Sequence, residues 1–330
     1  MKAAITLAAC AALVGSALSA PAADYPSKPI TLIIGFAPGG PSDVMARILT
    51  KKMEEVLKQP FVIENRAGAG GSIAGAAVAR ATPDGYTVLL ATGSLLAINV
   101  SLYKNIGYDP EKDFEPIGLI GTQTNVLYLH PAVPAQSFRE LIAHAKANPG
   151  KLSFGSGGNG TPAHLAGELL KIEAKIDITH VPFRGTGPAL QAVIGGHVPM
   201  AFNPPSPLLQ HIQSGAIRPV AITTLKRTAV LPEIPTIAES GFPGFEATTW
   251  HALVAPAGTP KEVIAALHAA TAATVNDPAV RKALTDLGVD VVGGTPDELR
   301  AYIKAEIPKW AEIVKAAGVK LSAEVMKRID

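Results

Sequence analysis

The N-terminal part of the chain alternates short apolar runs with glycine-rich stretches in a fixed order. Residues 30–34 form a continuous run of mostly branched apolar side chains, which is typical of a buried strand. Glycines and prolines at 35–41 break this run, and apolar residues then recur at helical spacing over 44–57. The pattern predicts a strand, a glycine loop and a helix, with Ser42 and Asp43 capping the helix.

The same order recurs twice in the next fifty residues. A second strand is predicted over 61–64, followed by a glycine loop and by Ser72 as the cap of a small-residue helix over 73–81. A third strand is predicted over 86–91, and residues 92–94 open a further loop at its end. Successive strand–helix units predict a doubly wound α/β sheet, in which ligands bind beyond the carboxyl ends of the strands.

The middle of the chain repeats the strand–loop–helix arrangement. Residues 117–130 have β character, Ser137 caps a helix over 138–147, and residues 152–154 form a short strand. A glycine loop over 155–160 then leads to Thr161 as an N-cap and Pro162 at the first helical position. Further strands are predicted over 178–183, 198–202 and 218–223, with helices over 189–194 and around 208–212.

Near residue 249 the chain returns to the first domain. A strand is predicted over 251–255, and helices over 260–275, 278–287 and 296–317 complete the domain. Thr295 and Glu298 form a capping box for the last helix.

The two strand–glycine loop–helix starts, at residues 35–43 and 155–164, are candidate anion sites. The first amides of a helix lack intrahelical acceptors, and the helix dipole adds positive charge there. The first loop lacks the Lys-Ser/Thr ending of a P-loop, and its glycines at 35, 39 and 40 do not form a G-x-G-x-x-G signature. The alternative is a tight turn in which glycine serves only the backbone geometry. With one start in each domain, the sequence predicts a clamp that holds a dicarboxylate at both ends and needs no metal or arginine.

Composition favours a compact exported protein. The 330 residues are 48% hydrophobic and 17% charged, which suits two globular domains, and the net charge of +2 gives no electrostatic case for nucleic acid. Residues 1–22 have the n-region, apolar stretch and small-x-small cleavage site of a signal peptide, so we expect export to a periplasm. Cys10 ends a lipobox-like sequence, but cleavage there would leave too short a leader. The mature chain then has no cysteine, hence no disulfide and no thiol nucleophile.

No catalytic or metal-binding constellation is present in the sequence. Serine nucleophile elbows and paired histidine motifs are absent, so we expect no catalysis, no metal and no cofactor. His164, in the first turn of a predicted helix, is either a packed histidine or a loop or ligand contact. Arg66 and Arg184 could each bind a carboxylate or form a loop-fixing ion pair, whereas Arg47 is expected to be structural.

Aromatic side chains stand at the ends of predicted strands. Phe36, Phe202 and Trp250 either wall a pocket or pack in the core.

A series of ordered motifs resembles the Bug-type extracytoplasmic solute-binding proteins, which serve tripartite tricarboxylate transporters. The motifs lie at residues 36–43, 64–72, 83–87, 99–103, 108–114, 154–164, 180–188 and 255–260. The resemblance implies an α/β, two-lobed type II periplasmic-binding-protein fold, in which each lobe is a mixed, mostly parallel sheet flanked by helices and the lobes are joined by a hinge. We expect residues 23–123 and 249–330 to form lobe 1 and residues 124–248 to form lobe 2.

The resemblance also implies ligand-contacting loops, acting partly through ordered water. With His164 and Trp250, the candidate ligand-binding residues are Phe36, Ala37, Gly39, Gly40, Ser42, Asp43, Thr92, Ser94, Ser156, Gly157, Gly158, Asn159, Gly160, Thr161, Arg184, Thr186, Phe202 and Asn203. Relatives often carry Asp at the position of Asn203, where it can receive a ligand ammonium. The neutral side chain here favours a plain mono- or dicarboxylate over an amino acid, aromatic acids included.

The resulting expectation is a monomeric periplasmic receptor that delivers a carboxylate to two membrane subunits. Two alternatives belong to other classes. One is an exported hydrolase that uses His164 or Asp43 as a base, and the other is a sensor domain that signals to a membrane kinase.

Overall fold

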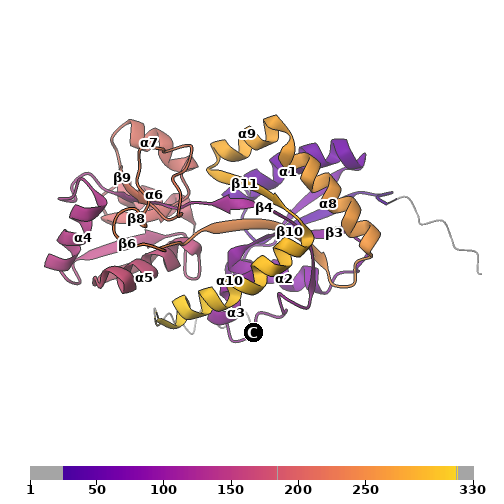
Figure 1. Cartoon of the computed structure of the whole chain (residues 1–330), viewed down its shortest axis with the longest axis horizontal. Helices are drawn as coiled ribbons and strands as arrows, with labels where there is room; N and C mark the ends of the chain where they lie inside the picture. The colour runs from indigo at the N-terminus through magenta and orange to yellow at the C-terminus, as the bar shows by residue number, and fades with distance from the viewer. Residues whose placement is uncertain (1–24, 184, 317, 319–330) are drawn as a thin grey trace, which may run out of the picture.

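A computed structural model describes residues 25–183, 185–316 and 318. Two lobes lie side by side along the long axis of the molecule, each a β-sheet with helices packed on it (Figure 1). The predicted α/β, two-lobed fold is confirmed. The predicted signal peptide, residues 1–22, and Arg184 lie outside the described residues.

Lobe 1 is built on a six-stranded sheet with the strand order β11-β4-β10-β3-β1-β2. Its strands are β1 (Ile30–Ile34), β2 (Phe61–Asn65), β3 (Thr87–Thr92), β4 (Phe114–Gln123), β10 (Thr249–Pro256) and β11 (Val289–Gly294). Its helices are α1 (Pro41–Leu57), α2 (Ser72–Ala79), α3 (Asn99–Leu102), α8 (Lys261–Asn276), α9 (Pro278–Asp286) and α10 (Pro296–Ala316), with the short η1 (Ala69–Gly71) and the π-helical η2 (Ser94–Ile98).

Lobe 2 is built on a five-stranded sheet with the order β7-β6-β8-β5-β9. Its strands are β5 (Val126–Leu129), β6 (Leu152–Ser156), β7 (Ile178–Pro182), β8 (Met200–Asn203) and β9 (Arg218–Ile222). Its helices are α4 (Phe138–Ala147), α5 (Pro162–Ala174), α6 (Thr186–Ile194) and α7 (Leu209–Gln213), with the short η3 (Ser206–Leu208).

Both sheets are mixed, and antiparallel pairings are more numerous than expected. Strand β1 is parallel to β2 and β3, and β6 is parallel to β7 and β8, while the other pairings are antiparallel. The topology explains this. Strand β4 carries the chain toward lobe 2 and β10 brings it back, so these neighbours must run in opposite directions. The predicted lobe limits stay a prediction; the sheets themselves change over between Gln123 and Val126 and between Ile222 and Thr249.

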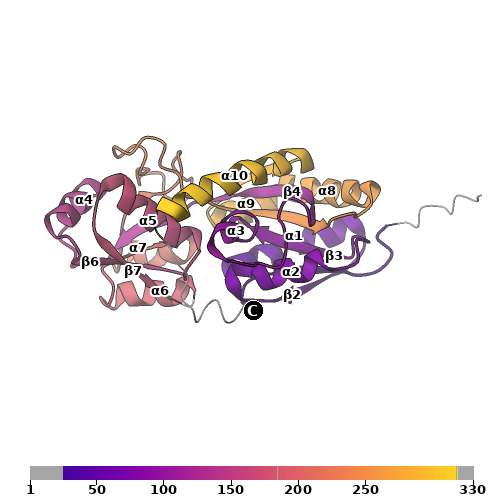
Figure 2. The same ribbon diagram turned by 90° about the horizontal axis from the view of Figure 1, so that it is seen from below.

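Alternating side chains of the lobe 1 strands pack on opposite faces of the sheet. Ile30, Leu32 and Ile34 pack in a core with α1, α8 and α9, whereas Ile33 packs in the core on the other face. That second core continues into lobe 2, and α10 extends along both lobes and contacts α5 (Figure 2). The lobes are therefore joined by continuous packing on the α10 side as well as by the crossing chain segments.

Local signals placed most element starts correctly. The caps Ser137 and Thr161 and the capping box of Thr295 with Glu298 are confirmed. Ser72 is instead the first residue of α2, and its hydroxyl contacts Asn99, so its predicted capping role is wrong. Residues 92–94 do not open a loop, since β3 runs directly into a helical segment. In the described part of the chain, no helix combines the length and the apolar character that crossing a membrane requires.

Candidate functional site

A cavity of about 600 Å³ lies between the lobes, a size usual for small-molecule sites. Its wall is formed by the loop before α1, the end of β3, the crossover after β4, and the starts of α5 and α6. The predicted residues found in this wall are Phe36, Ala37, Gly39, Gly40, Ser42, Thr92, Ser94, Gly157, Thr161 and Thr186.

In lobe 1 the start of α1 faces the cavity without a side-chain cap. The N-cap residue is Gly40, Pro41 occupies the first turn, and the amide of Val44 is the first to bond back, to Gly40 O at 3.0 Å. The N–H groups of Ser42 and Asp43 therefore have no intrahelical acceptor. The predicted capping role of these two residues is wrong, because both lie inside the first turn of the helix.

The Asp43 carboxylate is turned toward its own loop and does not line the cavity. It accepts hydrogen bonds from Gly39 N (3.0 Å), Arg47 Nε (2.9 Å) and Asn65 Nδ2 (3.1 Å). Burial by itself raises the pKa of Asp43, but these hydrogen bonds outweigh it and hold the pKa below its usual value. Asp43 thus fastens the loop in its ionised form, and the predicted structural role of Arg47 is confirmed.

In lobe 2 the start of α6 presents free backbone groups to the cavity. Gly185 is the N-cap without a side-chain bond, and residues 185–188 line the wall. Helix geometry leaves the amides of Thr186 and Gly187 without intrahelical acceptors. A Cβ added at Gly187 would meet nothing within 4 Å, so the approach to these amides is open.

The start of α5, where the sequence predicted the second anion site, is largely satisfied by its own side chains. Thr161 Oγ1 accepts from His164 N (3.3 Å), Gly160 N donates to His164 Nδ1 (3.1 Å), and Gly158 N donates to Ser156 Oγ (3.2 Å). Pro162 has no N–H, so Ala163 holds the remaining first-turn amide. Among the described residues, the free amides of lobe 2 gather at α6 more than at α5.

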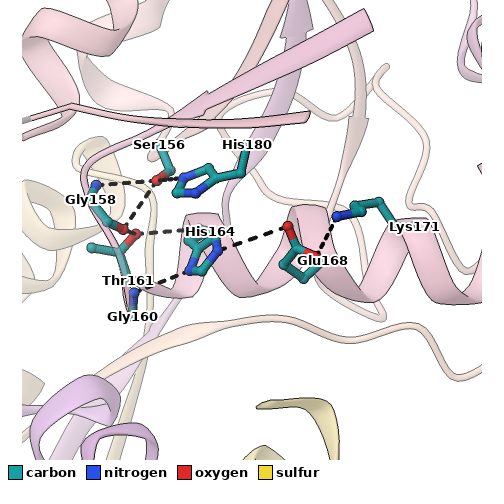
Figure 3. A network of polar contacts seen from close by, with 8 residues as sticks. All are labelled: Ser156, Gly158, Gly160, Thr161, His164, Glu168, Lys171 and His180. Atoms are coloured by element: carbon teal, nitrogen blue, oxygen red, sulfur yellow. Dashed lines mark hydrogen bonds and ion pairs between the residues drawn. The ribbon is translucent and has the colours of Figure 1, made fainter. Parts of the chain in front are cut away.

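A buried polar layer lies behind this glycine loop (Figure 3). Ser156 Oγ and His180 Nε2 are 2.7 Å apart, and the His180 ring stacks on His164 with 3.9 Å between centroids. Burial lowers the pKa of His164 to about 4 and that of His180 to about 3, so both rings are neutral at neutral pH. The predicted residues of this layer and loop that do not line the cavity are Ser156, Gly158, Asn159, Gly160 and His164.

The wall on the lobe 1 side also contains buried polar side chains that the sequence did not single out. His251 on β10 is paired with Thr92 on β3, and Asn125 follows the end of β4. Ser42 Oγ lies 3.4 Å from His251 Nε2, and burial lowers the pKa of His251 to about 4. Thr92 Oγ1, Asn125 Nδ2 and His251 Nδ1 have no hydrogen-bond partner among the described residues. The available signal for His251 was a polar residue inside an apolar strand run, and for Asn125 a polar stretch that interrupts the β character of residues 117–130.

Two of the three candidate aromatic walls belong to the core. Phe36 lines the cavity, but Phe202 is fully buried against Phe154, with 6.0 Å between ring centroids. Trp250 is also fully buried and donates from Nε1 to Glu306 Oε2 at 3.1 Å. Its strand neighbours Thr249 and His251 line the cavity instead, as the alternation of side chains along a strand requires.

Asn203, the last residue of β8, is hydrogen-bonded to the first residue of α6. Its Nδ2 donates to Thr186 O at 2.8 Å, and the residue is buried outside the cavity wall. The expectation, based on this neutral amide, of a plain acid over an ammonium-bearing ligand stays a prediction.

The described residues of the wall include no Lys, Arg, Asp or Glu. Arg66 pairs with Glu64 at 2.7 Å on the exposed side of the molecule and is not part of the wall. The features of this wall that favour negative charge are the uncapped starts of α1 and α6, with their amides and helix dipoles. No group of His, Cys, Asp and Glu suited to a metal ion occurs among the described residues.

Comparisons with known proteins point to one family. The model of the family described as "Tripartite tricarboxylate transporter family receptor" matches residues 45–319. Protein BugT of Bordetella pertussis is 39% identical over 94% of this chain and 95% of its own length. A Rhodopseudomonas palustris protein solved with adipate has a TM-score of 0.84 and 35% identity, covering 90% of this chain and 99% of that one. MatC of the same species, with bound malate, has a TM-score of 0.79 and 34% identity, covering 88% and 100%.

Proposed function

The chain belongs to the tripartite tricarboxylate transporter receptor family, and on that premise we propose that its interlobe cavity binds a small dicarboxylate. The family match and the relatives solved with adipate and malate support a solute-binding receptor for organic carboxylates. The resemblance to Bug-type proteins seen in the sequence is confirmed.

The observation that carries the proposal is the pair of uncapped helix starts on opposite lobes. Ser42 in α1 and Gly187 in α6, whose amides have no intrahelical acceptor, both line the cavity, and its described residues include no fixed charge. Hydrogen bonds to a charged group contribute roughly 1.5–3 kcal/mol each. Four or five of them, less the cost of association and closure, reach about −8 kcal/mol, which corresponds to micromolar affinity.

The ligands of two relatives support the choice of a dicarboxylate. The structures with adipate and malate are of proteins that share about a third of this sequence, and both ligands carry two carboxylates. We propose that one carboxylate is held at α1 and the other at α6, with Gly157 and Thr161 completing the lobe 2 side. A monocarboxylate, aromatic or aliphatic, would engage one of these helix starts and bind more weakly.

We further propose the setting in which the receptor acts. The chain would work as a monomer in the periplasm, after removal of residues 1–22, and pass its ligand to two membrane subunits. Lobe 1, residues 23–123 and 249–330, would rotate against lobe 2, residues 124–248, about the crossing segments.

A calorimetric acid panel tests the proposal. Adipate, malate, a tricarboxylate, an aromatic monocarboxylate and the uncharged diamide of adipic acid are titrated into the protein, with thermal unfolding measured in parallel. A dicarboxylate is expected to bind best and to stabilise by about 2.7 kcal/mol at a hundredfold excess over Kd, while the diamide has no effect. The absence of stabilisation by every acid would overturn the proposal.

Two further measurements separate the alternatives. An exported enzyme would convert its tightest ligand, whereas a receptor leaves it unchanged by NMR after long incubation. A sensor domain would leave solute uptake intact when its gene is deleted, whereas loss of a transport receptor abolishes uptake.

A further inference from the structure

A histidine that does not line the cavity contacts the glycine loop of lobe 2 through its side-chain neighbours, Ser156 and His164. His180, on β7, lies 2.7 Å from the Ser156 hydroxyl through Nε2 and stacks on His164, as Figure 3 shows. Ser156 Oγ in turn contacts both backbone groups of Gly158, donating to its carbonyl (3.1 Å) and accepting from its N–H (3.2 Å). The imidazole thus fixes the hydroxyl that fixes the turn.

The backbone held in this way is the part of lobe 2 that meets the cavity. Gly157 lies between Ser156 and Gly158 and lines the wall, and its carbonyl accepts from Gly185 N at 3.1 Å. Gly185 is the N-cap of α6, whose free amides face the same cavity. His180 is therefore connected, through Ser156 and the Gly157 turn, to the start of α6, which we propose holds a carboxylate.

The second ring of the stack holds the other end of the loop. His164 Nδ1 accepts from Gly160 N at 3.1 Å, and its backbone N–H donates to the Thr161 hydroxyl that lines the wall. Glycines 158 and 160 have φ values of +132° and +75°, conformations that L side chains rarely adopt. A loop with so little intrinsic preference for its conformation depends on such contacts for its shape.

A Ser–His contact of 2.7 Å could also indicate a nucleophile. Ser156 is fully buried, however, and its hydroxyl already bonds the Gly158 backbone. A substrate has no approach to this oxygen, so the contact serves geometry.

We propose that His180, acting through Ser156, is a positioning residue that sets ligand affinity by fixing the Gly157 turn against the start of α6. The inference rests on the proposed function, because its measured quantity is the affinity for a carboxylate. It adds to that function a residue that touches neither the cavity nor the ligand.

The test compares His180→Phe, His180→Gln and Ser156→Ala with wild type, using adipate and malate as probes in calorimetry at 25 °C. Phe keeps the stacking but removes Nε2, whereas Gln restores a polar group near that position. We expect roughly a tenfold rise in Kd for His180→Phe and Ser156→Ala, as for loss of one hydrogen bond, and recovery in His180→Gln. The double variant His180→Phe/Ser156→Ala should bind as weakly as Ser156→Ala alone, because His180 acts through the Ser156 hydroxyl.

His268→Phe is the matched control. His268 is half-buried on α8 and bonds Ile117 O at 2.9 Å, in a part of lobe 1 away from the cavity wall. It should keep wild-type affinity. Circular dichroism at 25 °C checks that each variant is folded. If His180→Phe does not fold, the affinity of Ser156→Ala tests the positioning role instead.

The outcomes distinguish failure of the proposed carboxylate binding from failure of the positioning role of His180. If wild type binds none of the acids, the proposed function fails. If wild type binds and the folded His180 and Ser156 variants bind equally well, with only their melting temperatures lowered, the positioning role is overturned. Additive losses in the double variant would contradict a shared contact.

Discussion

The N–H of Gly39 donates to Asp43 Oδ2 at 3.0 Å, so the loop that precedes α1 is fastened by a side chain of the helix itself. The same carboxylate accepts from Arg47 and Asn65, which ties α1 to the end of β2. Asp43 thereby takes part in the site without presenting its charge to the cavity. An anion at the α1 start consequently meets the amides of the first turn and no carboxylate oxygen.

Asp43→Ala removes this acceptor and is expected to loosen the loop. Gly39 N–H and the Asn65 amide lose their partner, which should lower the free energy of unfolding by about 1–3 kcal/mol and weaken dicarboxylate binding. Urea unfolding and calorimetry measure both effects. Asp286→Ala, which removes an exposed partner of Lys282, serves as control with a change below about 1 kcal/mol and unchanged affinity. Wild-type affinity in Asp43→Ala would show that the loop is not a ligand contact.

Gly187→Leu should block the cavity at the α6 start while sparing the fold. The position has an ordinary φ and open space around its Cβ, so the added side chain extends into the cavity without a steric clash. We expect at least a tenfold rise in Kd, with a melting temperature within about 2 °C of wild type. Ala265→Leu on the exposed side of α8 is the matched control. Unchanged binding in Gly187→Leu would remove α6 from the site.

Acid should destabilise the protein through two buried histidines, His164 and His251, and the half-buried His180. The pKa values of His164, His180 and His251 in the folded protein lie near 4, 3 and 4, below the ordinary 6.5. Between these values and pH 6.5 the unfolded chain therefore binds protons that the folded chain does not bind. Stability is therefore complete above about pH 6.5 and falls as the pH drops toward 4, by about 2 kcal/mol per histidine at pH 5. Lys171 also disfavours protonation of His164 and His180, while Glu168 lies 3.9 Å from His164.

Urea midpoints at pH 7.5, 6 and 5 check the acid effect. The free energy of unfolding of His180→Phe should fall less with decreasing pH than that of wild type, because the variant lacks one imidazole that takes up a proton on unfolding. Equal stability of wild type at pH 7.5 and 5 would contradict neutral buried histidines.

Glu306→Ala is expected to weaken the packing of α10 against β10 within lobe 1 without touching the cavity. Its carboxylate accepts from both indoles of the chain, Trp250 Nε1 at 3.1 Å and Trp310 Nε1 at 2.8 Å. Leaving two buried N–H groups unpaired should cost roughly 2–4 kcal/mol and shift the tryptophan emission. Glu246→Ala, which breaks only a half-buried pair with Lys309, should cost less than about 1 kcal/mol. Equal stability of the two variants would rule out this role of Glu306.

Sequence patterns located the strand–loop–helix starts well because their signals are local. Thr161 with Pro162 determines a helix start regardless of tertiary context, and the run from Ile30 to Ile34 is apolar on both faces because helices cover both sides of its sheet. Strand β11 was missed, since Asp290 interrupts its apolar residues and it ends in two glycines, none of which carries a β signal.

The site was predicted less completely, because side-chain direction depends on the tertiary structure. Trp250 stood out by its size, yet strand alternation turns it to the core and brings His251 to the cavity. Gly158 and Gly160 looked like free amide donors, but Ser156 and His164 satisfy them from positions that only the folded loop brings near. Thr186 was among the candidates because of the motif at 180–188, but the sequence does not show that the amides at Thr186 and Gly187 stay without a side-chain cap.

A crystal structure with the tightest-binding dicarboxylate tests the central claim most directly. The account predicts the ligand between the lobes, with one carboxylate within hydrogen-bond distance, directly or through one water, of the amides at Ser42 and Asp43 and the other at Thr186 and Gly187. A dicarboxylate held elsewhere, with the amides of both helix starts left to bulk solvent, would contradict it.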